Sequence, residues 1–253
     1  MSTSKIALIT GGSRGLGRNT AVSLARKGVD LILTYQSRAD DAQAAVAEIE
    51  ALGRKAVAFQ LDTGKVAGFD AFAGQVRTAL RDTWGRDSFD YLVNNAGAGH
   101  NAPFADTTEE AFDQLVNVQL KGVYFLTQKM LPLLADGGRI VNLSSGLARY
   151  ALPGFSAYAG MKGGIEVLTR YMAKELGPRG IAVNTVAPGA IETDFGGGAV
   201  RDNPDYNRLV AQATALGRAG VPDDIGPMIA ALLSEDQRWI NGQRLEVAGG
   251  AYL

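Results

Sequence analysis

A tyrosine and a lysine in the second half of the chain have the types and spacing of an acid–base pair. Tyr158 and Lys162 are four residues apart in the run Ser-Ala-Tyr-Ala-Gly-Met-Lys, where we expect a helix, so both side chains lie on one face, one turn apart. A phenol titrates near about pH 10 and is a poor base at neutral pH. A neighbouring ammonium favours the phenolate and is expected to lower the pKa of Tyr158.

A serine supplies a third group of the same site. Ser145 follows the apolar run Arg139–Ser144, which is typical of a buried strand. We expect its hydroxyl to hold a substrate oxygen beside the phenol and to stabilise charge that develops there. Tyrosine and lysine at this spacing often occur by chance on solvated helix faces, so the elements around the pair decide its meaning.

Strand-like and helix-like segments alternate along the whole chain. Stretches such as Asp40–Leu52 and Glu109–Leu134 carry apolar residues at spacings of three and four, which is typical of helices. Alternation implies a mostly parallel sheet with helices on both faces, and without linkers or repeats one domain over 1–253. The expected strands are Lys5–Thr10, Asp30–Tyr35, Lys55–Leu61, Tyr91–Asn94, Arg139–Ser144, Ile181–Val186 and Arg244–Val247.

Composition excludes several classes of function. A net charge of −1 does not favour binding to nucleic acid or to an anionic membrane. The chain has no cysteine, which excludes disulfides and thiol chemistry, and its single histidine, His100, leaves little for a histidine metal site or a Ser-His-Asp triad. The apolar start of the chain is too short for a signal peptide or a membrane span, so we expect a cytoplasmic protein.

The first expected strand runs into a glycine-rich turn that opens a helix. Glycines at this turn let the backbone approach a pyrophosphate, and the helix N-terminus offers free N–H groups and a positive dipole end. The sequence therefore predicts a dinucleotide site. Its residues here are Gly11, Ser13, Arg14, Gly15, Leu16 and Gly17.

The end of the second strand indicates which dinucleotide is bound. A site for NAD usually has an acid there, which binds the ribose 2′-hydroxyl. This chain has Tyr35, Ser37 and Arg38, with no acid before Asp40. Arg38 and Arg14 suit a 2′-phosphate, with Ser37 as a further donor, although each arginine alone is equally typical of a solvated surface. We therefore predict NADP(H).

Two later strand ends add residues to the same site. Asp62, with Thr63 beside it, follows the third strand, and Asp62 is expected to accept from the adenine amino group. Asn94, Ala96 and Gly97 follow the fourth strand and are expected to lie beside the ribose. Asparagine also occurs in turns for local backbone reasons.

A glycine- and proline-rich stretch, Pro188–Pro222, interrupts the alternation of strands and helices. It contains three successive glycines, 196–198, which suit a hinge. Long irregular segments inside a compact domain are usually lids or binding loops. We predict that 194–220 closes over the substrate; a tolerated surface insertion is the alternative.

The ordered motifs of the whole chain resemble those of the short-chain dehydrogenase/reductase family. The resemblance rests on Thr10–Gly17, Asn94–Gly97, Ser145, Tyr158–Lys162, the run 188–193 and the ending Trp-Ile-Asn-Gly-Gln at 239–243. It implies a seven-stranded Rossmann sheet, hydride transfer to or from the nicotinamide with tyrosine as general acid/base, and a homotetramer or homodimer. It also implies that Pro188, Gly189, Ile191 and Thr193 contact the cofactor, with Ile191 and Thr193 at its carboxamide, and that Lys162 and Tyr158 do so at the ribose and nicotinamide.

Two positions depart from the family pattern. The family commonly has a fourth catalytic residue, an asparagine that supports a water relay to the lysine, and Gln119 stands in that place. Glutamine keeps the amide but adds a methylene, which puts the relay in doubt. Ala248 stands where the family often has aspartate before two glycines, which bears on assembly or the terminal turn more than on chemistry.

Three functions fit these observations. The first is an NADP(H)-dependent oxidoreductase acting on a carbonyl or a secondary alcohol. The second is a 3-oxoacyl-[acyl-carrier-protein] reductase, which needs a basic patch for its acidic carrier; Arg179 is available, but Asp136 and Asp202 do not help. The third is an NADP(H)-binding regulator whose catalysis is weakened by Gln119.

Overall fold

The structure is a computed structural model that describes residues 4–253, and its centre is one seven-stranded sheet. All neighbouring strands are parallel, in the order β3-β2-β1-β4-β5-β6-β7. The direction of winding reverses between β1 and β4, and open sheets of this kind bind ligands at the carboxyl ends of the strands beside such a reversal. The strands are β1 (Ile6–Ile9), β2 (Asp30–Tyr35), β3 (Ala56–Gln60), β4 (Phe89–Asn94), β5 (Leu134–Leu143), β6 (Ala182–Pro188) and β7 (Arg244–Val247).

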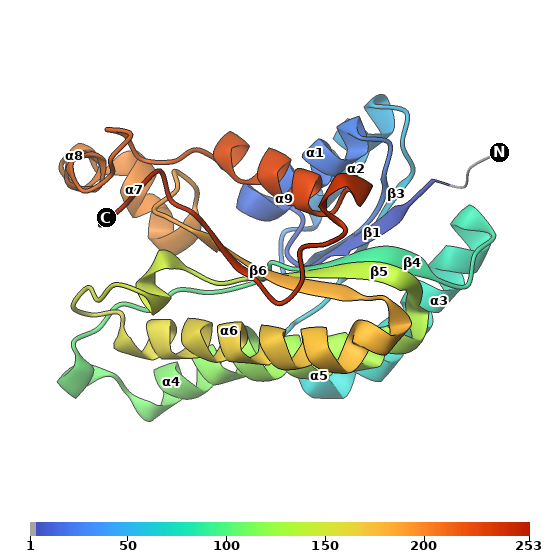
Figure 1. Cartoon of the computed structure of the whole chain (residues 1–253), viewed down its shortest axis with the longest axis horizontal. Helices are drawn as coiled ribbons and strands as arrows, with labels where there is room; N and C mark the ends of the chain where they lie inside the picture. Colours follow the sequence, from blue (N-terminus) through green and yellow to red (C-terminus); the bar gives the residue numbers. More distant parts are fainter. Residues whose placement is uncertain (1–3) are drawn as a thin grey trace.

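Helices cover both faces of the sheet (Figure 1). Successive strand residues point to opposite faces, so Leu31 and Leu33 pack toward one helix layer and Ile32 toward the other. The first layer holds α1 (Gly15–Arg26), α2 (Ala39–Ala51) and α9 (Gly226–Leu232); the second holds α3 (Phe69–Trp84), α4 (Glu109–Leu115), α5 (Gly122–Met130) and α6 (Ser156–Leu176). The predicted single Rossmann-type α/β domain is confirmed. Among the described helices, none is both long and apolar enough to cross a membrane.

The expected helix over Glu109–Leu134 is helical from Glu109 to Met130, but it differs from the prediction in its interior and at its end. The structure has α4, then a π-helical segment over Val116–Lys121, then α5, and β5 already begins at Leu134. Pro132 lies in the 3₁₀ turn after α5; it lacks an amide hydrogen and disfavours helix in the residue before it. The apolar spacing of three and four does not reveal a π turn.

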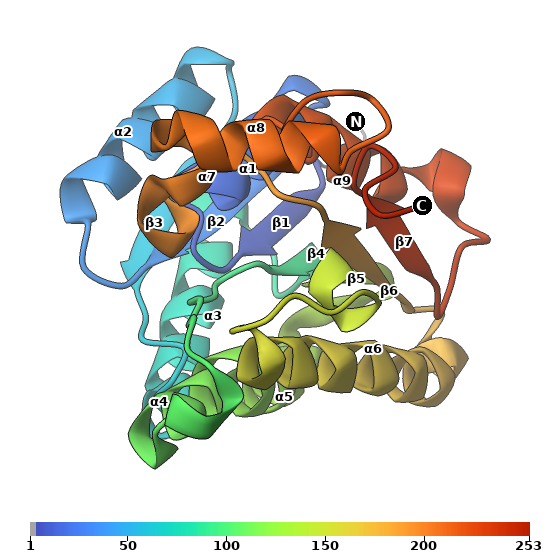
Figure 2. The same ribbon diagram turned by 90° about the vertical axis from the view of Figure 1, so that its left-hand side faces the viewer.

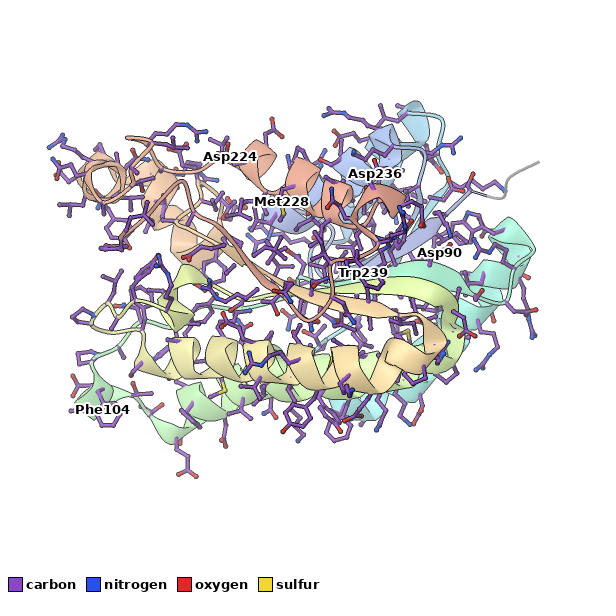
Figure 3. The ribbon with its side chains drawn as sticks, viewed as in Figure 1. Asp90, Phe104, Asp224, Met228, Asp236 and Trp239 are labelled. Carbon is purple, nitrogen blue, oxygen red and sulfur yellow. The ribbon has the colours of Figure 1, made fainter. Side chains whose placement is uncertain are left out.

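The two ends of the sheet differ. At the amino ends, buried Asp90 pairs with Lys5 at 3.1 Å and Arg86 at 2.8 Å, and Figure 3 labels Asp90 far from the opposite end. At the carboxyl ends lies the segment 194–220, which folds into α7 (Ala199–Asp202) and α8 (Pro204–Gln212) (Figures 1 and 2). Helix α7 was not predicted from the sequence. Helix α8 is capped by the Asn203 side chain, which accepts from the Asp205 and Tyr206 amides.

Candidate active site

The three groups predicted to do chemistry meet beyond the carboxyl end of β5. Tyr158 and Lys162 lie in the first two turns of α6, and the lysine Nζ is 5.6 Å from the centre of the phenol ring. Ser145 is two residues beyond β5, and its hydroxyl hydrogen-bonds the phenol. Tyr158 is only 7 % exposed and Lys162 5 % exposed, so both polar heads lie in a site from which most water is excluded.

Burial sets the charge states of this pair, and it corrects one expectation. Loss of solvent raises the pKa of Tyr158 well above its usual value, and the Ser145 hydroxyl opposes that rise. Loss of solvent also lowers the pKa of Lys162 to about 7. In the protein without cofactor the predicted lowering of the tyrosine pKa does not occur, because desolvation dominates; the lowering was expected from the amine together with the positive charge of an oxidised nicotinamide, and for that state it stays a prediction. The phenol is neutral and is ready to donate its proton.

Lys162 and Ser145 are held by backbone groups. The Lys162 Nζ donates to the Leu143 carbonyl at 2.7 Å. The Ser145 Oγ accepts from the Leu147 amide at 3.2 Å, which fixes the rotamer of the hydroxyl. Each group thus has a defined direction before any ligand binds, which is the preorganisation that a stabiliser of developing charge needs.

Gln119 lies in the π-helical segment and is 1 % exposed. Its amide nitrogen donates to the Ala98 carbonyl, and its oxygen is buried without a partner among the described residues. A Cβ at Gly97 would come within 3.0 Å of the Gln119 amide, so the glycine makes room for the longer side chain. The glutamine is thereby anchored to the turn after β4, and it leaves one acceptor unused.

The glycine-rich turn has the geometry of a phosphate cradle. Gly11 and Gly15 have φ values of +65° and +53°, which favour glycine, and a Cβ at Gly17 would collide with the Gly11 carbonyl. The first turn of α1 has neither an acidic residue nor a capping side chain, so its N–H groups are available to an anion. Asn95, in the predicted Asn94–Gly97 run, donates to the Thr10 and Gly11 carbonyls at 2.8 and 3.1 Å and holds this turn.

The other predicted cofactor residues lie along the same carboxyl edge of the sheet. A Cβ at Gly15 would lie 3.8 Å from the Thr193 Cβ, so the loop after β6 touches the glycine-rich turn. The Asp62 carboxylate accepts from the Gly64 amide at 3.0 Å. The remaining residues lie at or just beyond the ends of their strands: Tyr35 and Ser37 at β2, Thr63 at β3, Ala96 and Gly97 at β4, and Pro188, Gly189 and Ile191 at β6.

The two predicted 2′-phosphate ligands form ion pairs that reach solvent. Arg38 pairs with Asp41 at 3.2 Å on the first turn of α2. Arg14 pairs with Asp194 at 3.0 Å, and Asp194 also pairs with Arg201 of α7. Arg14 therefore ties the glycine-rich turn to the segment predicted to be a lid. These half-exposed pairs are weak, so a phosphate can compete for both guanidinium groups.

Asn94 has a different role from the one predicted. Its side chain points into the core and donates to Thr127 at 3.0 Å and to the Asn142 side chain at 2.8 Å. The Asn142 amide in turn donates to Thr169 on α6. This buried network joins the ends of β4 and β5 to the helix of Tyr158. The amide of Asn94 therefore does not face a cofactor beside the ribose.

Aromatic side chains line the approach to the trio. Phe195 lies with its ring centre 5.9 Å from that of Tyr158, and its ring packs on Gly99, where a Cβ would come within 2.9 Å. Tyr150 lies over Gly146, next to Ser145, and stacks on Tyr252 with ring centres 4.3 Å apart. Tyr252 is the one described non-glycine residue with positive φ, +54°. The C-terminal segment thus adds a wall that the sequence did not reveal.

A cavity of about 180 Å³ lies elsewhere, beneath the base of the segment 194–220. It is lined by residues that include Ile191, Leu216 and Ala248, and neither Tyr158 nor Ser145 lines it. Ala248, the second departure from the family pattern, therefore faces this cavity. The polar trio, and not this cavity, identifies the active site.

Comparison with known proteins agrees with this geometry. The family model described as Enoyl-(Acyl carrier protein) reductase matches residues 11–252. Short-chain dehydrogenase/reductase FrzI of Cladobotryum sp. is 37 % identical over 253 residues, with 97 % of this chain and 95 % of that protein covered. Hydroxynaphthalene reductase arp2 of Aspergillus fumigatus is 34 % identical, with 94 % of this chain and 89 % of that protein covered.

A solved structure extends the likeness to three dimensions. The angucycline C-6 ketoreductase LanV with bound NADP superposes with a TM-score of 0.93 at 35 % identity, with 98 % of this chain and 95 % of that chain covered. The agreement therefore spans the whole domain and includes the segment 194–220. This chain belongs to the short-chain dehydrogenase/reductase family of oxidoreductases.

Proposed function

We propose that this protein is an NADPH-dependent ketoreductase in which Tyr158 protonates the carbonyl oxygen of a flat aromatic ketone. The observation that carries the proposal is the buried, neutral phenol, hydrogen-bonded to Ser145 and one helical turn from Lys162. A donor that stays protonated at neutral pH suits reduction better than oxidation.

In the proposed reaction, Tyr158, Ser145, Lys162 and Gln119 each have a separate role. NADPH, when bound, supplies the hydride to the carbonyl carbon. Tyr158 gives its proton to the oxygen, and Ser145 holds that oxygen and stabilises the charge on it. Lys162, whose pKa of about 7 lets it release and regain a proton at neutral pH, reprotonates the phenol and binds the cofactor ribose. Gln119 offers its unused buried oxygen to the water that supplies Lys162.

The preference for NADPH rests on charge. The end of β2 presents Ser37 and Arg38 and lacks an acid, and Arg14 reaches the same edge from the glycine-rich turn. The glycine cradle and the uncapped first turn of α1 fit the phosphates of a dinucleotide. LanV, which shares this fold, binds NADP.

The aromatic walls support the substrate class. Phe195 and Tyr158 form one wall, and the stacked pair Tyr150 and Tyr252 forms a second near Ser145. Offset stacking on such rings favours a planar ligand by about 1 kcal/mol for each ring pair. A hydroxynaphthalene reductase and an angucycline ketoreductase stand among the similar proteins. The segment 194–220 closes over this ligand, with Gly196, Gly197 and Gly198, all at positive φ, as its hinge.

The position of Arg179 does not support the alternative of a 3-oxoacyl-[acyl-carrier-protein] reductase. Arg179 pairs with Asp136 at 2.7 Å and donates to the Leu131 carbonyl. It follows α6 and precedes β6, and so lies at the amino ends of the strands, away from Tyr158. An acidic carrier bound there would not deliver its thioester to the phenol.

A substrate panel tests the proposal. NADPH oxidation is measured with 2-tetralone, cyclohexanone and an acetoacetyl thioester, and NADPH binding is measured by fluorescence. We expect the highest kcat/KM for 2-tetralone, by about tenfold over cyclohexanone. Preference for the thioester would favour the carrier-protein reductase, and tight NADPH binding without turnover of any ketone would favour the regulator.

A further inference from the structure

Four charged side chains, partly shielded from solvent, form one cluster behind Ser145. They are Arg244 and Glu246 of β7, Glu166 of α6, and Arg149 of the loop after β5. Arg244 occupies the centre: its Nε donates to Glu166 at 2.6 Å and its Nη1 to Glu246 at 3.2 Å. The third nitrogen, Nη2, donates to the backbone carbonyl of Ser145 at 3.3 Å. One guanidinium thus joins the edge strand, the helix of Tyr158 and the serine itself.

The cluster is connected both to Ser145 and to α6, the helix that carries Tyr158. Glu166 lies one helical turn beyond Lys162 on α6. The hydroxyl of Ser144 donates to Glu166 at 2.7 Å and lies 3.3 Å from the Lys162 carbonyl. The chain is therefore tied to Glu166 of α6 directly at Ser144, and through Arg244 of β7 at Ser145.

The remaining bonds prevent the cluster from turning. Arg149, four residues after Ser145, pairs with Glu246 at 2.8 Å and donates to the Ala251 carbonyl at 3.1 Å. The turn that carries the serine is thus fixed on both sides. Charged hydrogen bonds with this degree of burial keep a fixed geometry better than exposed ion pairs do.

We propose that Arg244 is a positioning residue for the reaction, and that it sets the distance between the Ser145 hydroxyl and the Tyr158 phenol. The proposal rests on the ketoreductase function proposed above. Arg244 acts by holding the Ser145 carbonyl against α6 through Glu166, not through its own contact with the reacting atoms. A displacement of about 1 Å at a catalytic group costs up to about a hundredfold in rate.

The test compares three purified variants with the wild type at a temperature well below every melting point. Arg244→Met removes all three hydrogen bonds of the guanidinium, and Arg244→Lys keeps the charge. Arg139→Met is the matched control, because Arg139 is a buried arginine of the same sheet that pairs with Glu235 at 3.3 Å and precedes the active-site end of β5. The readouts are kcat and KM for the ketone, the Kd for NADPH and Tm.

We expect Arg244→Met to lower kcat by about ten- to a hundredfold, with the Kd for NADPH and the KM changed less than threefold. Arg244→Lys is expected to lose less than Arg244→Met, and Arg139→Met to lower Tm while keeping kcat. The proposal is overturned if folded Arg244→Met keeps kcat within twofold, or if Arg139→Met loses as much kcat at an equal loss of Tm. If Arg244→Met does not fold, Arg244→Lys decides the question. The proposal is then overturned if Arg244→Lys has both the kcat and the Tm of the wild type. A wild-type protein that reduces no ketone would contradict the proposed function instead.

Discussion

At the scale of single residues, desolvation controls the site. Tyr158 and Lys162 are buried next to each other, and burial shifts both toward their neutral forms. The sequence identified the pair and its spacing, because a helix turn fixes which residues share a face. It gave the wrong sign for the tyrosine pKa of the protein without cofactor, because burial depends on Phe195 and other residues distant in the chain.

The buried lysine predicts a pH dependence of stability in the protein without cofactor. Its pKa is about 7 in the folded protein and ordinarily 10.5, so between these values the unfolded chain alone binds the proton. The free energy of unfolding therefore rises with pH in this window, by at most about 1.4 kcal/mol per pH unit. Tyr158, whose pKa burial raises above its usual value of 10.0, is protonated in both the folded and the unfolded chain up to about pH 9 and adds nothing to the slope there. Nearer pH 10 the unfolded phenol ionises, which opposes the rise.

Urea unfolding at pH 7, 8 and 9 measures this effect. Lys162→Met should lose the rise, whereas Lys27→Met, at an exposed lysine, should keep it. Parallel pH curves for the wild type and Lys162→Met would show that the lysine is not desolvated.

Arg38 is the residue expected to distinguish NADPH from NADH. Arg38→Ala removes a guanidinium whose own partner, Asp41, is half exposed and easily displaced. We expect the Kd for NADPH to rise by about ten- to a hundredfold, with NADH affinity nearly unchanged. Arg77→Ala, at an exposed arginine of α3, serves as control. Equal losses for both cofactors in fluorescence titrations would place the 2′-phosphate elsewhere.

At the scale of elements, strand ends were predictable and helix irregularities were not. β2 and β7 have the predicted bounds, because β-branched and apolar runs bounded by turns are unambiguous. The π-helical segment was missed, although it carries Gln119 and turns its amide toward Gly97 and Ala98. The wall formed by Tyr150 and Tyr252 was also missed, since residues a hundred positions apart meet only in the fold.

Gln119→Asn tests what the π-helical segment does for the reaction. Asparagine keeps an amide oxygen, and the lost methylene leaves room for a water beside Gly97 and Ala98, so we expect kcat to be preserved or raised. Steady-state NADPH oxidation and Tm are measured together. A large fall in kcat at unchanged Tm would mean that the bond from Gln119 to the Ala98 carbonyl positions the active site.

At the scale of the whole molecule, stabilising contacts and the groups predicted to do chemistry lie at opposite ends of the strands. Ion pairs and apolar packing close the amino ends of the strands, and all the predicted chemical groups gather at the carboxyl ends. The alternation of strands and helices was enough to predict this layout, because parallel connections are right-handed and leave one common edge for ligands. Surface assembly was not predictable in this way.

We predict that the protein is a homotetramer. Tyr124, Val167 and Tyr171 are exposed on α5 and α6, two helices that lie side by side along one side of the molecule (Figure 2), and an exposed apolar patch on such a face usually contacts another chain. Light scattering after size exclusion should give four times the chain mass of 26.6 kDa. Tyr171→Glu should halve that mass, and a wild-type mass of one chain would contradict the prediction.

The most direct measurement compares wild type and Tyr158→Phe for NADPH oxidation by 2-tetralone, with NADPH binding measured on the same samples. The substitution removes one hydroxyl from a buried ring and leaves Lys162 and the glycine cradle in place. We predict that turnover falls by at least about a thousandfold, while the Kd for NADPH changes by less than about threefold. Turnover by Tyr158→Phe at more than a tenth of the wild-type rate would contradict the assignment of Tyr158 as the proton donor.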